Sequence, residues 1–253
     1  MEFLFIGLIV GTIGTLIGAG GGFLLVPLLI YKFPNLPAPQ IAAISMLGVG
    51  ANATSGSIAY AFKSQIHWRS ALLFSLTAIP GIYLGIFLND QVNRQFFVTM
   101  FGMIIIILST YIFIKSLDKK ILVENGPHQF HFDKRKAYIG GVISIFIGIL
   151  SSFLGIGGGV IHVPLLGTVL NYPIHLAAGT SHFILALTSS IAVSEHWIRG
   201  NYHSHQNFLI YLIVGIVAGA QVGATLSKHV SSSKILKILS AALFLGGIRL
   251  CLY

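Results

Sequence analysis

A glycine-rich pattern occurs twice in this chain, first as Gly18-Ala-Gly-Gly-Gly-Phe-Leu-Leu-Val-Pro-Leu-Leu29 and again as Gly155-Ile-Gly-Gly-Gly-Val-Ile-His-Val-Pro-Leu-Leu166. Eight of the twelve positions are identical, at an offset of 137 residues. Further matching pairs keep the same order along the chain: Leu36-Pro37 with Tyr172-Pro173, Ala42-Ala43 with Ala177-Ala178, Gly81 with Gly219, and Gly85 with Gly223. Because order and spacing persist over so much of the chain, we infer a duplicated unit. The first repeat covers residues 1–116 and the second covers 137–253, joined by a linker at 117–136.

The composition predicts an all-α polytopic membrane protein. Of the 253 residues, 55% are hydrophobic and 8% are charged, whereas soluble domains carry about 25% charged residues. The long segments with at most two charged residues are Ile41–Phe62, Ala71–Leu88, Phe96–Ile114, Tyr138–Leu154, Leu176–Ile198, Phe208–Leu226 and Ile235–Leu252. Each approaches the ~20 residues with which a helix crosses a ~30 Å hydrocarbon core. We therefore expect a multi-pass protein with the lipid bilayer as its solvent, located in a cell inner membrane.

The glycine patterns also interrupt the first apolar segment of each repeat. Phe3–Tyr31 divides at the glycines and Pro27 into pieces of roughly 15 and 9 residues, and the shorter piece rises only ~14 Å. One topology therefore has a broken or re-entrant first helix followed by three full spans per repeat, which makes the repeats inverted. The other topology has four ordinary spans per repeat.

The distribution of basic residues bears on this choice, because Lys and Arg are in excess on the cytoplasmic side. The fifteen Lys and Arg divide 11 to 4 with the broken helices and 10 to 5 with ordinary spans. The four on the poorer side in the first topology are Lys32, Arg94, Arg199 and Arg249. We favour the inverted repeats, with the linker on the cytoplasmic side.

The formal charge of +9 does not indicate a nucleic-acid partner, because the basic residues lie between apolar segments rather than in one dense patch. The single Cys251 excludes an intrachain disulfide and a multi-cysteine metal site. No Gly-x-x-x-x-Gly-Lys-Ser/Thr phosphate loop occurs, which argues against ATP hydrolysis by the chain. We expect no cofactor and no metal, and the sequence leaves the oligomeric state open.

The doubled pattern Gly-x-Gly-Gly-Gly-x-x-x-Val-Pro-x-Leu is followed in each repeat by small and polar residues, Ala42–Ser45 and Ala178–Ser181. In this combination it resembles the sulfite exporter TauE/SafE family of membrane permeases, over nearly the whole chain except the linker. The resemblance implies an inner-membrane permease for sulfite, sulfoacetate or a related sulfur-containing or organic anion. The chain departs from the family pattern at His182, where an apolar residue usually follows Gly-Thr-Ser.

The glycine runs are candidates for binding an anion at membrane depth. An anion leaves water only if other donors replace its hydration, and glycine runs expose consecutive N–H groups at the positive end of the helix that follows. The alternative is that these glycines only allow helices to pack closely. The candidates are Gly20, Gly21, Gly22, Gly157, Gly158 and Gly159.

Polar side chains within the spans supplement the glycines. Ser45 corresponds in position to Thr180 and Ser181 of the second repeat, and Asn52 carries both a donor and an acceptor. These side chains are candidates for orienting an oxyanion, or alternatively for hydrogen bonds between helices. The cluster Thr188–Ser190 is better explained by bonds to its own helix backbone.

Three titratable residues are candidates for proton coupling: His162, His182 and Glu195. The histidines have apolar counterparts in the first repeat, so the second repeat is the more titratable. The alternative for each histidine is a neutral ring in the core. For Glu195 it is an interfacial ion pair with Arg199, four residues on.

We expect a secondary transporter of a small anion, with proton coupling as a hypothesis, that works by alternating access around the paired glycine motifs. A passive anion channel is the nearest alternative. An intramembrane hydrolase using Ser55 and a base at His182 or His196 is disfavoured, because the Gly-x-Ser-Gly spelling is absent.

Overall fold

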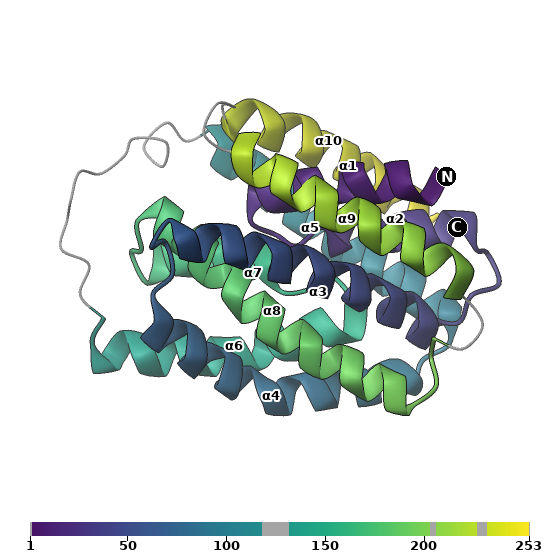
Figure 1. The fold of residues 1–253 in the computed structure, drawn as a ribbon. Coiled ribbons are helices and arrows are strands. Elements are labelled where there is room, and N and C mark those ends of the chain that lie inside the picture. The colour runs from purple at the N-terminus through teal and green to yellow at the C-terminus, as the bar shows by residue number, and fades with distance from the viewer. Residues whose placement is uncertain (1, 118–131, 203–205, 227–231, 253) are drawn as a thin grey trace.

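The computed structural model describes residues 2–117, 132–202, 206–226 and 232–252. This part of the chain is helical and contains no strand (Figure 1). The elements are α1 (Glu2–Ile17), α2 (Gly22–Lys32), α3 (Ala38–Phe62), α4 (Trp68–Asp90), α5 (Arg94–Leu117), α6 (Lys134–Leu154), α7 (Gly159–Pro164), the π-helical turn η2 (Leu165–Val169), α8 (Ile174–Ile198), α9 (Gln206–Leu226) and α10 (Ser232–Cys251). Within the described residues, six helices are long and apolar enough to cross a membrane: α3, α4, α5, α6, α8 and α9. The all-α polytopic class is therefore confirmed.

The first apolar segment of the first repeat is broken at the glycines. Helices α1 and α2 have 16 and 11 residues, and the chain between them turns back on itself. The start of α1 and the end of α2 lie together, because Glu2 forms an ion pair with Lys32 and the rings of Phe3 and Phe33 stack 6.1 Å apart. This part of the chain is therefore a hairpin that begins and ends at the same end of the molecule.

The second repeat has the same break with different lengths. Helix α6 has 21 residues, starts with the Asp133 carboxylate accepting a hydrogen bond from Lys136 N (2.8 Å), and ends at Gly155 with a left-handed backbone. The six-residue α7 and η2 then lead back, so that a Cβ on Gly140 near the start of α6 would lie 3.1 Å from Leu170. The linker prediction falls mostly on 118–131, outside the described residues, while α5 extends to Leu117 and α6 begins at Lys134.

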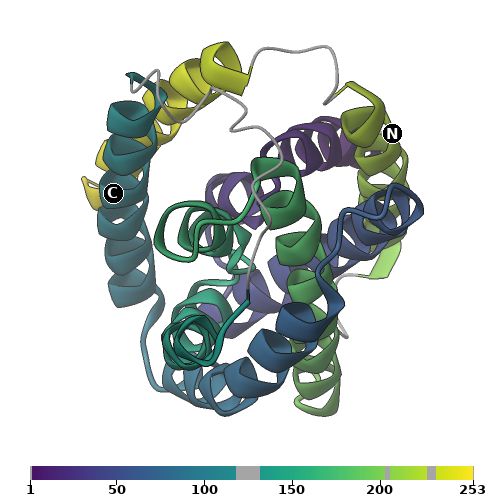
Figure 2. The ribbon, with the colours of Figure 1, turned by 90° about the vertical axis from the view of Figure 1, so that its left-hand side faces the viewer.

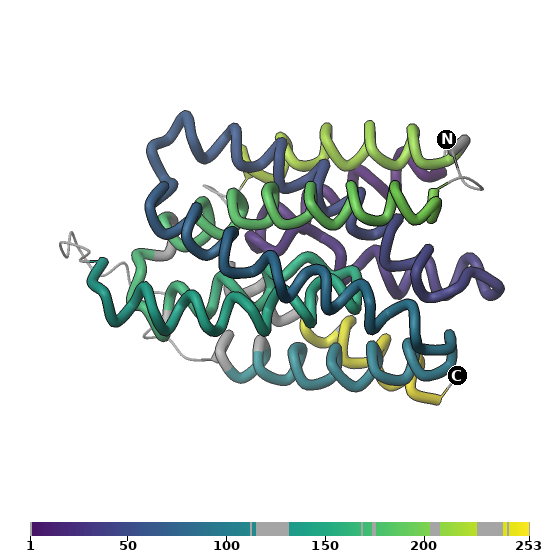
Figure 3. The backbone as a smooth tube through the Cα atoms, turned by 90° about the horizontal axis from the view of Figure 1, so that it is seen from below, coloured from purple at the N-terminus to yellow at the C-terminus, as the bar shows by residue number. Residues whose placement is uncertain are grey.

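Each long helix of one repeat packs mainly against a helix of the other repeat. Helix α1 packs along α9, and its counterpart α6 packs along α4, while α3 pairs with α8 and α5 pairs with α10 (Figures 2 and 3). Glycines make the exchanged pairs close: Gly81 and Gly85 of α4 lie against the backbone of Ile145 and Ile149, and Gly219 and Gly223 of α9 lie against Leu8 and Thr12. These four glycines are therefore packing positions, because small residues let helix backbones approach closely within a membrane. In Figure 1, α3 and α8 run in opposite directions.

The helix bundle has two ends. We call them the Lys63 end and the Arg199 end, after the residues that cap the C-termini of α3 and α8. At the Arg199 end, Arg94 donates to Leu36 O (3.0 Å), Arg249 lies 5.0 Å from the Tyr31 ring, and Arg199 pairs with Asp90. Lys32, paired with Glu2, lies on the neighbouring α1–α2 hairpin. These are the four basic residues on the poorer side of the broken-helix topology. At the Lys63 end, Lys63 donates to Ala224 O (3.3 Å).

Candidate functional site

The two glycine motifs cross each other inside the molecule. A Cβ on Gly22, the first residue of α2, would lie 2.6 Å from Ile156 O in the second motif. A Cβ on Gly159, the first residue of α7, would lie 2.9 Å from Gly18 O in the first motif. Real Cβ atoms do not approach backbone this closely, so only glycine fits at either position. The structure therefore brings together the two motifs that the sequence singled out.

Apolar residues of the α3–α8 pair border the crossing. Val49 and Leu185 are buried and belong to one small cluster with Ala53. Val49 faces both motifs, since a Cβ on Gly20 of the first motif or on Gly157 of the second would lie 3.1 and 2.2 Å from its Cγ1 atom. The crossing is therefore enclosed by close-packed side chains.

The backbone donors of the two motifs differ. Gly20, Gly21 and Gly157 have positive φ angles of 77°, 80° and 64°, the left-handed region that favours glycine. In the described part of the chain, the N–H groups of Gly21 and Gly22 have no acceptor. The N–H of Gly158, in contrast, donates to the Ser151 hydroxyl (2.7 Å). The first motif therefore offers donors at the N-terminus of α2, where the helix dipole is positive.

Ser45 is the predicted polar residue that reaches the motifs. It is fully buried in α3, and its hydroxyl donates to Gly155 O (2.5 Å). Its counterpart Ser181 in α8 is also fully buried, and its hydroxyl has no partner among the described residues. Buried hydroxyls are normally hydrogen-bonded, so Ser181 retains a capacity for hydrogen bonding.

Asn52 joins α3 to α1. Its amide nitrogen donates to Gly11 O (2.9 Å), and its amide oxygen accepts from the Thr15 hydroxyl (3.1 Å). It is fully buried. Both ends of the amide are thus hydrogen-bonded to α1. This is the alternative to anion binding given above, a hydrogen bond between helices.

Thr180 lies toward the Lys63 end rather than at the crossing. Its hydroxyl accepts from the backbone N–H of His67 (3.0 Å) in the α3–α4 connection. Partial burial, and then the nearby positive charge of Arg69, lower the pKa of His67 below its ordinary value. Thr180 therefore holds a connection whose histidine is neutral at physiological pH.

His182 lies in the interface of α3 and α8. Its Nδ1 donates to Ala178 O (3.3 Å), its ring centroid lies 5.2 Å from that of Tyr60, and its Nε2 has no partner among the described residues. The ring fills the space that Gly56 leaves, since a Cβ on Gly56 would lie 2.9 Å from Nε2. Because Nδ1 carries the proton in the neutral ring, Nε2 presents a lone pair.

His162 follows the second motif directly. It is buried in α7, and its Nε2 lies 3.4 Å from the Ser144 hydroxyl of α6. Its Nδ1 has no partner in the described residues. A Cβ on Gly158 would lie 3.0 Å from this nitrogen, so His162 lies beside the crossing, whereas His182 contacts Tyr60 of α3.

Glu195 lies at the Arg199 end. Its carboxylate accepts from Arg199 (2.8 Å), and Arg199 also pairs with Asp90 at the end of α4. The i, i+4 pair that the sequence offered as an alternative is thus present. Thr188, Ser189 and Ser190 donate to carbonyls of their own helix, as expected.

Sequence reasoning did not identify a groove of about 680 Å³ between α3, α8 and α9. Its polar lining residues are Thr54, Ser55, Ser190, Ser194 and Gln221. The Gln221 amide donates to the Ser55 hydroxyl (2.7 Å), and Ser190 and Ser194 are bonded to their own helix. The groove is therefore lined mainly by apolar side chains, and four of its five polar side chains are already hydrogen-bonded to the protein.

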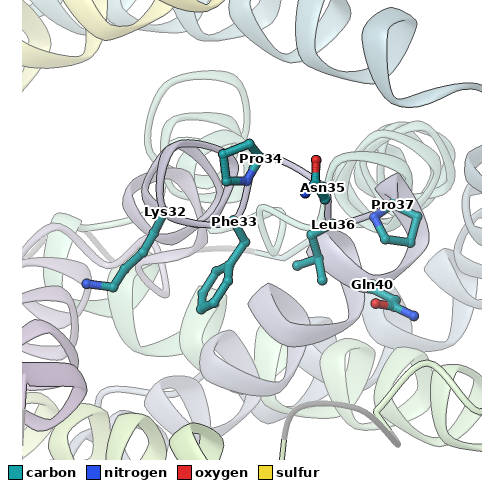
Figure 4. A pocket seen from close by; sticks show the side chains of 7 residues that line it. All are labelled: Lys32, Phe33, Pro34, Asn35, Leu36, Pro37 and Gln40. Atoms are coloured by element: carbon teal, nitrogen blue, oxygen red, sulfur yellow. The ribbon is translucent and has the colours of Figure 1, made fainter.

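A second hollow, of about 350 Å³, lies at the α2–α3 connection. It is lined by Lys32, Phe33, Pro34, Asn35, Leu36, Pro37 and Gln40 (Figure 4). None of the predicted site residues lines it. In the described residues no three His, Cys, Asp or Glu gather as a metal site.

Internal repeats and membrane helices broken near the repeat interface are features of many secondary transporters. The comparison with known families agrees, because residues 3–250 match the family described as Sulfite exporter TauE/SafE. The chain belongs to this family, and it is a membrane transporter rather than an enzyme.

Related proteins are named as probable membrane transporters. The probable membrane transporter protein YunE of Bacillus subtilis is 29% identical, with 97% of this chain and 94% of that protein aligned. A probable membrane transporter protein of Xylella fastidiosa is 31% identical over 87% of this chain and 81% of its own length. No solved structure matches the chain.

Proposed function

We propose that the protein is a secondary transporter of a small anion, namely sulfite, sulfoacetate or a related sulfur-containing or organic anion, in a cell inner membrane. The observation that carries this proposal is the crossing of two glycine-broken hairpins, Gly22 against Ile156 and Gly159 against Gly18. Broken helices that meet at the repeat interface are where secondary transporters place their substrates. The family membership supports the class of substrate.

The anion site in this proposal is centred on the first motif. The N–H groups of Gly21 and Gly22 at the start of α2 bind the anion, assisted by the N-terminal end of the helix dipole. Gly20 and Gly157–Gly159 shape the crossing, and Ser45, Ser181 and Asn52 fix the surrounding backbone or complete the donors. Thr180 takes part indirectly, through the connection that it holds.

Alternating access in this proposal rocks the two repeats about the crossing. The repeats are inverted, a relation supported by the opposite directions of α3 and α8 and by the exchanged pairing of α1 with α9 and α6 with α4 (Figure 1). The cytoplasmic side is the Lys63 end, where Lys63, Arg69 and the basic start of α6 lie.

Proton coupling is assigned to His182, with His162 as the second candidate. The unpartnered Nε2 of His182 accepts a proton inside the α3–α8 interface, which places a positive charge beside the anion's path. Glu195 is the weaker candidate because Arg199 already neutralises its carboxylate.

The test is anion uptake into proteoliposomes, using sulfite, thiosulfate, sulfoacetate and sulfate under an imposed pH gradient. The proposal expects saturable uptake of at least one of these anions that follows the gradient. A passive channel would instead give uptake that does not saturate. Absence of flux for every anion, with the protein folded and inserted, would contradict the substrate class.

A further inference from the structure

The residues that cap α3 and α8 are equivalent cations with different partners. Both helices have 25 residues and start after a proline, and they are capped at their C-termini by Lys63 and Arg199, 136 residues apart. Arg199 pairs with two carboxylates, Asp90 and Glu195. Lys63 has no carboxylate partner among the described residues: its Nζ donates to Ala224 O (3.3 Å) and lies 5.8 Å from the Tyr60 ring centroid. One end of the α3–α8 pair is therefore charge-compensated and the other is not.

The side chains one helical turn inside these two cations also differ between the two ends. At the Lys63 end, Tyr60 contacts His182 with ring centroids 5.2 Å apart. At the Arg199 end, the positions equivalent to His182 and Gly56 are Met46 and Ala192, which pack together in an apolar cluster. The tyrosine–histidine contact, and the glycine that makes room for the His182 ring, thus occur at the end with the uncompensated cation. At the Arg199 end the position equivalent to Tyr60 is His196, whose Nε2 also lacks a partner among the described residues, but the cation beside it is paired with carboxylates.

The Tyr60 ring connects the cation to the histidine. Lys63 is half-buried, Tyr60 is 5% exposed and His182 is 0% exposed, so the three residues lead from the surface into the α3–α8 interface. A cation at the edge of a low-dielectric interior attracts an anion more strongly than one in open water. The hydrogen bond from Lys63 to a neutral carbonyl leaves this charge available.

We propose that Lys63, Tyr60 and His182 form an anion-recognition subsite at the Lys63 end, separate from the glycine crossing, through which the transported oxyanion enters or leaves. This inference rests on the proposed transport function and adds that the two faces of the membrane differ in their affinity for the anion. Lys63 draws the anion to the mouth, and the Tyr60 hydroxyl donates to it. His182 donates to the anion once its Nε2 has taken up a proton. The Arg199 end has no such subsite, because its cation is neutralised, so the apparent affinity for the anion differs between the two faces of the membrane.

The test compares Lys63→Gln and Lys63→Arg with Arg69→Gln, which removes an exposed charge at the same end. Sulfoacetate flux is measured in right-side-out and inverted vesicles. Lys63→Gln should raise KM about tenfold from the Lys63 side only, the loss expected for one charge-assisted contact, with maximal rate preserved. Lys63→Arg and Arg69→Gln should both stay near wild type. An equal rise in KM from both sides, or a fall in maximal rate shared by Lys63→Arg, contradicts the subsite and indicates a structural role.

A binding measurement separates this inference from the transport proposal. At constant ionic strength, the sulfoacetate concentration that raises the melting temperature by a given amount should be the same for the purified wild type and Arg69→Gln, and about tenfold higher for Lys63→Gln. Stabilisation of all three variants alike, or of none, overturns the subsite. Stabilisation that depends on Lys63 without any flux overturns the transport proposal and leaves the subsite intact.

Discussion

In the first glycine motif the N–H groups of Gly21 and Gly22 have no acceptor among the described residues. In the second motif the equivalent Gly158 and Gly159 donate to the Ser151 hydroxyl and to Gly157 O, although the two motifs share eight of twelve residues. The difference arises seven residues upstream, where Ser151 binds the Gly158 N–H (2.7 Å) and its counterpart in the first repeat is Gly14. Gly14 has no side chain, and a Cβ there would lie 2.6 Å from Gly21 N. Motifs that look alike in sequence thus differ in the number of donors they present.

The helices after the motifs differ as well. Helix α2 continues for 11 residues, whereas α7 has six residues and passes into the π-helical turn η2. π-Helical turns are rare and often occur at functional sites. The comparison suggests a division of roles, in which the first repeat binds the anion and the second, with His162 and His182, carries the titratable groups.

The largest expected effect comes from Gly22→Ala. The new methyl group would collide with Ile156 O and Val49, so we expect a loss of about 1–3 kcal/mol in stability from overpacking and loss of transport. Thermal melting of the detergent-solubilised protein, together with flux, measures both. Gly167→Ala is the matched control, because a Cβ there meets nothing within 4 Å. Normal melting and flux in Gly22→Ala would show that the motifs do not cross.

The second prediction concerns His182→Met, which installs the residue found at the equivalent Met46. If His182 carries the coupled proton, the variant should transport the anion but lose the response to a pH gradient. Flux with and without the gradient is the measurement. His196→Gln, also a buried histidine of α8, serves as the control and should keep the response. Full pH-driven transport in His182→Met would transfer the coupling role to another residue.

A moderate effect is expected from Asn52→Ala. The substitution leaves Gly11 O and the Thr15 hydroxyl without their partner, which should cost about 1–3 kcal/mol of stability. KM should change little, because the amide is occupied by α1. Melting and kinetics distinguish the two roles, with Thr188→Ala as a control whose hydroxyl bonds only its own helix. A large rise in KM with normal melting would instead assign Asn52 to the anion.

The smallest effect is expected from Ser151→Ala. This change frees the Gly158 N–H and makes the second motif resemble the first, so the KM for the anion should fall, about two- to threefold for a partly formed hydrogen bond. Steady-state uptake at varied anion concentration measures it. An increase in KM would mean that Ser151 itself supports the site.

Much of this architecture follows from the sequence, because duplication and apolar length are local properties. The break at Gly18–Gly22 belongs to this class. The hydrogen bond from Ser45 to Gly155, 110 residues away, does not. The exchange of partners between repeats was not predictable, since helix faces rich in glycine fit α1 and α6 equally well. Thr180 was expected at the site, yet it holds the His67 connection, because adjacent positions of a helix point about 100° apart.

The sequence likewise predicts only those ion pairs whose members are close together along the chain. The i, i+4 spacing predicts the Glu195–Arg199 pair, but not that Asp90, 109 residues away in sequence, joins it. The uncompensated state of Lys63 is likewise visible only after folding, because it depends on which residues of α9 come near. The hydrogen bond from the Gly158 N–H to Ser151 depends on a single hydroxyl in a helix with several serines, so the sequence does not predict it.

The most direct test of the central claim is counterflow in proteoliposomes loaded with unlabelled sulfoacetate or sulfite. A carrier that alternates about the crossed motifs should accumulate the labelled anion transiently above its external concentration, and Gly22→Ala should not. Labelled anion that only equilibrates, at a rate unaffected by the internal load, would contradict alternating access and indicate a passive channel.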